Sequence, residues 1–120
     1  MRHILALSLC SLVFMTVGTH AATDVAAGKQ LYDDNCKRCH GASAGGGAGM
    51  KLKGDAAYWS PDVFKRAVMT GVDDENRKMK ALMPVWGKTG LTKPKGKIPT
   101  DDDLANIQSY LQTLGPKTAD

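Results

Sequence analysis

Two cysteines separated by two residues and followed at once by a histidine constrain this chain more than any other feature. They are Cys36, Cys39 and His40, in the stretch Cys36-Lys37-Arg38-Cys39-His40. This CxxCH pattern is typical of the attachment site of a c-type haem. If both cysteines lie in the last turn of a helix, their sulfurs share one side and reach the two vinyl groups of one porphyrin. The pattern therefore predicts covalent haem on Cys36 and Cys39, with His40 beneath the iron.

Two other uses of a CxxC motif compete with haem attachment. A zinc site needs a second pair of ligands, but the other candidates are Cys10, His3 and His20, all in a segment that we expect to be removed. A thiol–disulfide motif is the remaining alternative, and it prefers a strand leading into the CxxC turn. Here the residues before the motif look helical, which favours haem.

The first 21 residues have the features of a secretory signal peptide. A charge at Arg2 precedes an apolar run from Ile4 to Val17, and Thr19-His20-Ala21 provides a small-residue exit. Cleavage after Ala21 leaves residues 22–120 as a single domain outside the cytoplasm, expected in the periplasm. No later stretch approaches the roughly 20 apolar residues of a spanning helix, so we expect no membrane span. A domain of this size has a thin apolar core, which a buried macrocycle would supplement.

The residues before the motif predict a helix that leads into it. Thr23 or Asp24 can cap this helix, and Val25, Gly28, Tyr32 and Cys36 recur at helical spacing. Gly28 is costly in a helix interior, and it is expected where a second helix crosses closely.

Two further helices are predicted, and no run of alternating residues indicates a sheet. Ser60-Pro61 opens a middle helix that Gly71 closes. Thr100 and Asp103 resemble a capping arrangement at the start of the last helix, which Gly115-Pro116 stops. Asp101–Asp103 are expected at that helix N-terminus rather than in a calcium site, because spaced oxygen ligands are missing.

Three separated pieces of the chain resemble class I cytochrome c of the small bacterial type. They are residues 28–40 (GKQLYDDNCKRCH), residues 83–87 (MPVWG) and the last helix with Leu104, Ile107 and Tyr110-Leu111. The resemblance implies an all-α cytochrome c fold of three to five helices around one covalently bound haem c. It also implies that the first and last helices cross, here at Gly28, Tyr32 and Tyr110.

The resemblance further implies that a methionine sulfur is the second axial ligand of the iron. Met83 matches, because it precedes Pro84 as in the family's MPxW-like signature, and proline biases the preceding residue toward an extended conformation. Met50, Met69 and Met79 are less suited by position, although Met79 or no protein side chain remains the alternative. Ligation by His40 and Met83 raises the reduction potential and leaves no open position for a substrate, so an enzyme is not expected.

The haem environment is predicted from apolar residues around these ligands. The family often has Gly-Pro-x-Leu after the motif, and this chain has Gly49-Met50-Lys51-Leu52, so a carbonyl at Met50 can orient His40 without the rigidity of proline. The expected lining residues are Leu52, Trp59, Phe64, Val68, Leu82, Trp86, Leu91 and Ile98.

Charge placement gives the best indication of partners. The net charge is +4, but seven basic residues and no acid occur in residues 77–97, around Met83. These charges are expected at the exposed haem edge, where they could steer a redox partner with an acidic docking patch. The alternative is a solvated lysine-rich loop without a partner. The seven basic residues of this segment are Arg77, Lys78, Lys80, Lys88, Lys93, Lys95 and Lys97.

Nucleic acid is not expected as a partner of an exported haem protein.

The sequence therefore predicts a periplasmic monohaem electron carrier, either a monomer or a subunit of a complex. One alternative is the haem subunit of a multi-subunit dehydrogenase complex. Another is a haem protein with an open iron site, acting as a peroxidase or a gas sensor.

Overall fold

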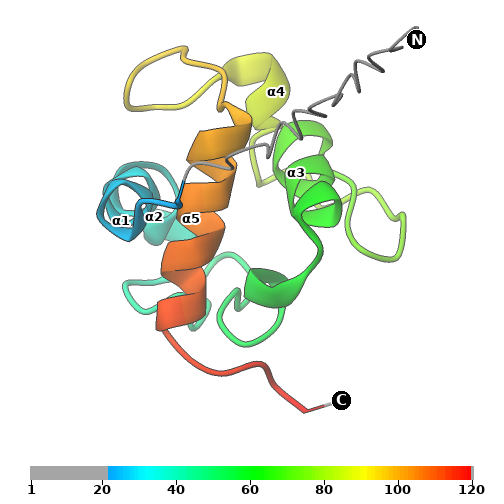
Figure 1. Ribbon diagram of the computed structural model, residues 1–120. Helices are drawn as coiled ribbons and strands as arrows, with labels where there is room; N and C mark the ends of the chain where they lie inside the picture. The colour runs from blue at the N-terminus through cyan, green and yellow to red at the C-terminus, as the bar shows by residue number, and fades with distance from the viewer. Residues whose placement is uncertain (1–21, 120) are drawn as a thin grey trace, which may run out of the picture.

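The computed structural model describes residues 22–119, and this part of the chain is helical (Figure 1). The predicted signal peptide, residues 1–21, lies outside the described residues. Apart from one isolated antiparallel bridge between Val72 and Lys78, residues 22–119 form no β-structure. The predicted all-α fold is thus confirmed. The elements are α1 (Val25–Asn35), α2 (Lys37–His40), a 3-10 helix η1 (Ala56–Tyr58), α3 (Pro61–Thr70), α4 (Trp86–Thr89) and α5 (Asp101–Thr113).

The first and last helices cross, as the resemblance implied. Figure 1 shows α5 along its length and α1 nearly end-on against it. A Cβ atom on Gly28 would overlap the backbone carbonyl of Asn106, so only glycine permits this approach. Beside it, the rings of Tyr32 and Tyr110 pack with centroids 5.5 Å apart and planes tilted by 53°. The crossing therefore fixes α1, and with it the residues that follow.

Side-chain caps set the beginnings of the three main helices. The Asp24 carboxylate accepts a hydrogen bond from the Ala27 N–H at 2.9 Å. Ser60 caps α3, which ends at Gly71 in the left-handed region with φ 71°. Thr100 and Asp103 form a reciprocal capping box on α5. These three predicted helix starts are confirmed.

The predicted first helix differs in one respect, because it is interrupted at Cys36. Helix α1 ends at Asn35, Cys36 adopts φ −112° and ψ −37°, and α2 begins at Lys37. The Cys36 N–H still bonds to the Tyr32 carbonyl at 2.8 Å, and the His40 N–H bonds to the Cys36 carbonyl at 3.0 Å. Cys36 and Cys39 therefore lie around a short helical turn rather than in the last turn of one helix.

The Asn35 side chain fastens this turn to the loop before α5. Its Oδ1 accepts from the Thr92 and Lys93 N–H groups at 2.9 and 3.0 Å. Its Nδ2 donates to the Leu31 and Lys93 carbonyls at 3.0 and 2.9 Å. All the hydrogen-bonding capacity of the amide is thus used in joining the end of α1 to residues 92–93.

The hydrophobic core lies where α1, α3 and α5 meet. The buried core cluster comprises Tyr32, Ala44, Ala57, Phe64, Leu104, Ile107, Tyr110 and Leu111.

None of the helices in residues 22–119 combines the length and apolar content needed to cross a membrane.

Candidate haem site

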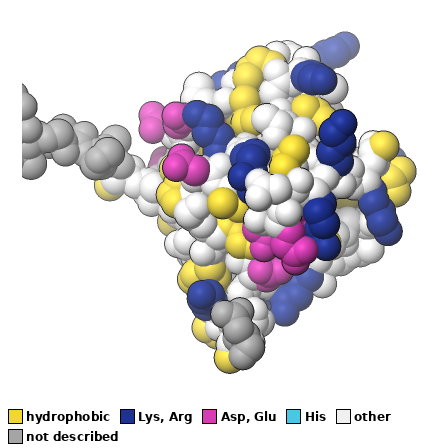
Figure 2. Space-filling model, turned by 90° about the vertical axis from the view of Figure 1, so that its right-hand side faces the viewer, with side chains coloured by type: hydrophobic (Ala, Val, Ile, Leu, Met, Phe, Trp, Pro, Cys, Tyr) yellow, Lys and Arg dark blue, Asp and Glu magenta, His cyan; other side chains and the backbone are white. Residues whose placement is uncertain are grey.

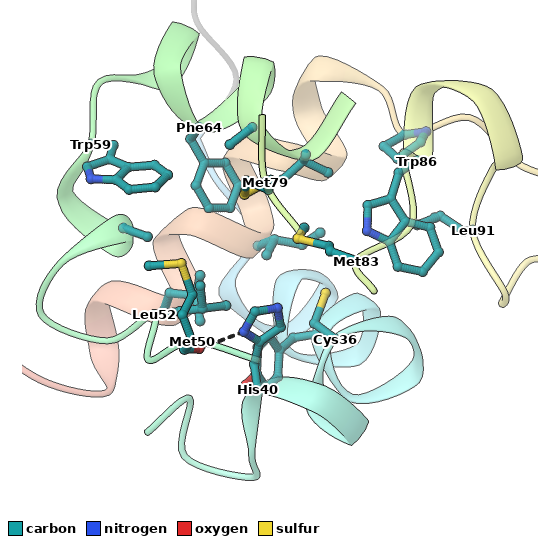
Figure 3. A pocket seen from close by; sticks show the side chains of 17 residues that line it. Cys36, His40, Met50, Leu52, Trp59, Phe64, Met79, Met83, Trp86 and Leu91 are labelled. Atoms are coloured by element: carbon teal, nitrogen blue, oxygen red, sulfur yellow. Dashed lines mark hydrogen bonds between the residues drawn. The ribbon is translucent and has the colours of Figure 1, made fainter. Parts of the chain in front are cut away.

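An apolar cavity, here called the inner cavity, opens between α1, α3 and α5 (Figure 3). Figure 3 shows the His40 imidazole on one side of it and the Met83 and Met79 sulfurs on the other. Both predicted iron ligands thus reach one cavity. Its walls are almost entirely hydrocarbon, aromatic and thioether side chains. They come from Tyr32, Cys36, His40, Met50, Leu52, Ala56, Trp59, Phe64, Ala67, Val68, Met79, Met83, Trp86, Leu91, Pro99, Ile107 and Leu111.

An open groove of about 610 Å³, here called the outer groove, shares six lining residues with the inner cavity. Cys36, Cys39, His40 and Met83 all line it. This volume lies in the range of ligand and cofactor pockets, and concave apolar sites with few polar groups suit a large flat macrocycle. The residues present therefore fit the group that the motif predicts, with two sulfurs for attachment, an imidazole and a thioether.

His40 is oriented by the segment that follows it. Only 6% of the residue is exposed. Its Nδ1 lies 2.7 Å from the Met50 carbonyl oxygen, and because a carbonyl can only accept, Nδ1 carries the proton. Nε2 then keeps its lone pair for a metal. The expected carbonyl contact is present even though methionine replaces the family's proline.

Gly49 packs directly on the face of the His40 ring. A Cβ atom at this position would lie 2.8 Å from Cε1 and 2.9 Å from Nδ1 of His40, closer than such atoms approach. The backbone of Gly49 is itself held, because its N–H bonds to the Cys39 carbonyl at 2.8 Å. The ring is therefore confined by backbone atoms on one side and by a hydrogen bond at its edge.

The two cysteines differ in their surroundings. Cys36 is half-buried and lines both cavities, whereas Cys39 is exposed and lines the outer groove alone. Burial, followed by the influence of Cys39, raises the pKa of the free Cys36 thiol to about 12. Both sulfurs border the outer groove, so both could hold a macrocycle bound there.

Met83 lies on a loop that makes few hydrogen bonds near it. Its N–H makes a long bond of 3.3 Å to the Lys80 carbonyl. Met79 is held better, since its N–H bonds to the Gly71 carbonyl at 2.8 Å and the neighbouring Lys78 pairs with Val72. Met79 was judged less suited by its position, but it is half-buried and lines both cavities together with Met83.

The predicted lining is largely found, with one error. Ile98 is 44% exposed and lines neither cavity, because its loop turns outward before α5. Leu82 lines the outer groove but is 83% exposed. The prediction missed Tyr32 on α1 and Ile107 and Leu111 on α5, which also line the inner cavity. The six residues found in the inner cavity as predicted are Leu52, Trp59, Phe64, Val68, Trp86 and Leu91.

The seven basic residues of the 77–97 segment differ in their position relative to the outer groove. Only Arg77, Lys78 and Lys80 line the outer groove. Figure 2 shows basic side chains dispersed over the face that carries α3, with hydrophobic and acidic side chains between them. The other four basic residues of the segment do not line this groove: Lys88, Lys93, Lys95 and Lys97.

The helical fold and the CxxCH site together define a c-type cytochrome resembling class I. The chain belongs to the family described as cytochrome c oxidase, cbb3-type, subunit III, whose model matches residues 23–111. Membership implies covalently bound haem c and a role in electron transfer. No solved structure matches the chain significantly.

Two curated relatives are similar to most of this chain. The cbb3-type cytochrome c oxidase subunit CcoP of Azospirillum sp. (strain B510) is 27% identical over 104 residues, covering 80% of this chain and 32% of the relative. The cbb3-type subunit FixP of Bradyrhizobium sp. (strain ORS 278) is 29% identical over 93 residues, covering 74% and 30%. The chain thus spans about a third of the length of these relatives.

Proposed function

We propose that this chain is the haem-bearing electron-transfer subunit of a larger oxidoreductase complex outside the cytoplasm. The observation that carries the proposal is the meeting of His40 and Met83 at one apolar cavity, in a chain of a family described as an oxidase subunit. The names of both relatives as oxidase subunits support a complex rather than a free carrier. The same proposal makes residues 1–21 a signal peptide, residues 22–120 one domain and the periplasm its compartment.

In this proposal Cys36 and Cys39 would hold one haem c covalently, and His40 and Met83 would bind its iron. The haem supplies a one-electron iron couple when bound. The protein's own residues do the rest. The His40 Nδ1–H donates to the Met50 carbonyl oxygen, with 2.7 Å between Nδ1 and O. This hydrogen bond orients the ring so that Nε2 stays directed toward the cavity. Phe64, Trp86 and Leu91 are buried in the cavity wall and exclude water, which favours the less charged state of a redox centre.

No residue of this proposed site acts as an acid, base or nucleophile toward a substrate. With both axial positions filled by side chains, a peroxidase or gas-sensing role would require displacement of Met83. Carbon monoxide tests this point directly. The ferrous holoprotein is expected not to bind carbon monoxide, and rapid binding by the untreated protein would favour the open-site alternative.

A free periplasmic carrier is the second candidate. It is favoured by the exposed side chains of Lys78 and Lys80 on the outer groove, since such charges raise the rate of transient encounters with acidic partners. Native electrophoresis of mildly solubilised cells, stained for haem, separates the two. We expect haem staining of this chain at the size of a multi-subunit complex, and staining only at about the size of the free chain would establish the carrier instead.

A further inference from the structure

The segment that carries the predicted sulfur ligand is attached to α3 at both ends. Residues 71–86 leave the end of α3 and return to it at α4 (Figure 1). A Cβ atom on Gly87 would lie 2.4 Å from the Met69 carbonyl oxygen, so α4 packs directly on the last turn of α3. At the other end, the Arg66 side chain on α3 donates from Nη2 to the Asp73 carbonyl oxygen at 2.7 Å. A side chain of α3 thus holds the beginning of the segment.

The residue that Arg66 holds belongs to a small hairpin. The Asp73 N–H donates to the Arg77 carbonyl at 2.9 Å, and the Met79 N–H donates to the Gly71 carbonyl at 2.8 Å. Between Met79 and α4 the described chain makes one hydrogen bond, the 3.3 Å bond of the Met83 N–H. The position of the sulfur ligand therefore depends on where the hairpin and α4 are held.

The Arg66 side chain is half-buried, and its charge has no partner of opposite sign in the described chain. Its Nε is buried and has no hydrogen-bond partner among the described residues. No carboxylate of residues 22–119 forms an ion pair with it, whereas the neighbouring Lys65 pairs with Asp101 at 2.7 Å. Partial burial of an unpaired charge is unfavourable. The charge-assisted hydrogen bond to the Asp73 carbonyl offsets part of this cost.

We propose that Arg66 is a positioning residue for the iron, which keeps the Met83 sulfur bound by holding the segment of residues 71–86 closed. The inference rests on the proposed function, in which Met83 would bind the iron. Arg66 lines neither cavity, so it acts through the Asp73 carbonyl and the hairpin. Loss of this hydrogen bond should let the segment open more often and expose the iron to small ligands from solvent.

Cyanide binding by the ferric holoprotein measures this opening. The iron–sulfur bond to Met83 breaks, a bond from the iron to the cyanide carbon forms, and the iron stays ferric. Arg66→Gln is expected to bind cyanide about tenfold faster than the unaltered protein, because one charge-assisted hydrogen bond of the closed segment is lost. Lys65→Gln is the matched control, since it makes the same change in charge on the same helix, and its rate should stay within about twofold of the unaltered protein.

A conservative variant and a stability measurement distinguish positioning from a merely structural role. Arg66→Lys keeps a charged donor, so it should bind cyanide only about threefold faster than the unaltered protein, and it decides the question alone if Arg66→Gln yields no holoprotein. The reduction potential of Arg66→Gln should shift in the same direction as that of Met83→Ala. A lower free energy of unfolding in urea, with cyanide rate and potential unchanged, would overturn the proposal.

Two further measurements separate Arg66 from the proposed function. In a Met83→Ala background, Arg66→Gln should not accelerate cyanide binding further, because the bond whose breakage limits the rate is absent. A further acceleration of the same size would overturn action through Met83. Immediate cyanide binding by a high-spin unaltered protein would overturn ligation by Met83 in the proposed function itself. A low-spin unaltered protein with equal rates in Arg66→Gln and Lys65→Gln would overturn the role of Arg66 alone.

Discussion

Residues 36–52 and residues 71–86 reach the inner cavity from opposite sides, and they are held in different ways (Figure 3). We call them the proximal segment and the distal loop. The proximal segment is tied to itself by backbone bonds, with Gly46 N–H donating to the His40 carbonyl at 2.9 Å and Leu52 N–H donating to the Ala44 carbonyl at 2.9 Å. Together with the Gly49 and Met50 contacts, these bonds leave the His40 ring one orientation.

The distal loop has fewer constraints near its predicted ligand. Residues 80–82 and Pro84 are exposed, and Met83 is held by one long backbone bond. Its hydrogen bonds concentrate further back, where the Asp73 carboxylate accepts from Glu75 and Arg77. The proximal ligand His40 is therefore positioned by backbone contacts, whereas the position of Met83 would depend largely on its own bond to the iron. Changes in the two regions should therefore affect different measured properties.

The largest effect is expected from removing the proximal attachment. Cys36→Ser combined with Cys39→Ser should abolish covalent haem, because no thioether bond can form at either position. Haem staining of a denaturing gel measures this loss, with the unaltered protein as the positive control. A stained band from the double variant would show that the motif is not the attachment site.

Removal of the distal ligand should change redox properties while the fold stays intact. Met83→Ala is expected to lower the reduction potential by on the order of 100 mV, a fraction of the roughly 0.8 V range that axial ligands control. The ferrous form should then bind carbon monoxide, since a coordination position becomes open. Met79→Ala is the matched control and should change both properties less. A Met83→Ala protein with unchanged potential and spectrum would transfer the ligand role to another side chain.

A more modest effect is expected from crowding the proximal ring. Gly49→Ala should lower the free energy of unfolding by about 1–3 kcal/mol, because its Cβ would collide with the His40 imidazole or displace the ring. Gly115→Ala is the control, since a Cβ there meets no atom within 4 Å, and it should change stability by less than about 0.5 kcal/mol. Urea unfolding of both holoproteins measures the difference, and equal stabilities would remove the proposed confinement of His40.

The smallest expected effect is a difference in how the two regions respond to acid. The proximal segment contains no carboxylate, whereas Asp73 in the distal loop accepts bonds from the Arg77 and Glu75 backbone and from the Arg77 side chain. The backbone bond from Arg77 is the main cause that lowers the pKa of Asp73. A lowered folded-state pKa stabilises the loop above the unfolded pKa of about 3.9, and this stabilisation is lost as the pH falls through the folded value.

Acid should therefore loosen the distal loop while His40 remains held. The sulfur-to-iron charge-transfer band of the ferric protein reports Met83 ligation and should weaken reversibly in this acid range. Asp73→Asn removes the titrating group, so its band should depend less on pH. An identical acid transition in the two proteins would exclude Asp73 as the cause.

Much of the fold was accessible from local sequence rules, because caps and helical spacing act over a few residues. Asp24, Ser60 and Thr100 mark helix starts in the sequence and in the structure. Gly28 predicted a helix crossing, although Asn106 as its partner depends on three-dimensional packing. The break at Cys36 escaped prediction, because its neighbour Asn35 is bound to residues far away in the chain.

The candidate site was predictable in its chemistry more than in its surroundings. The CxxCH motif and the residues after it supplied Cys36, Cys39, His40 and the Met50 carbonyl, all within a short segment. The inward position of Met79 and the outward position of Ile98 were not predictable, because each depends on how a long loop closes against distant helices. Arg77 is paired with Asp73 and Glu75, and Lys97 is paired with Asp103. These ion pairs decide which basic residues keep an unpaired charge, and the net charge along the sequence does not reveal them.

A spectroelectrochemical titration of the holoprotein tests the central claim most directly, since it reports ligation and potential together. The account predicts one reversible one-electron step, a low-spin iron with the sulfur-to-iron band in the ferric state, and no change on adding carbon monoxide to the ferrous state. A high-spin iron that binds carbon monoxide at once would contradict ligation by His40 and Met83. Colourless protein with free thiols at Cys36 and Cys39 would contradict haem attachment altogether.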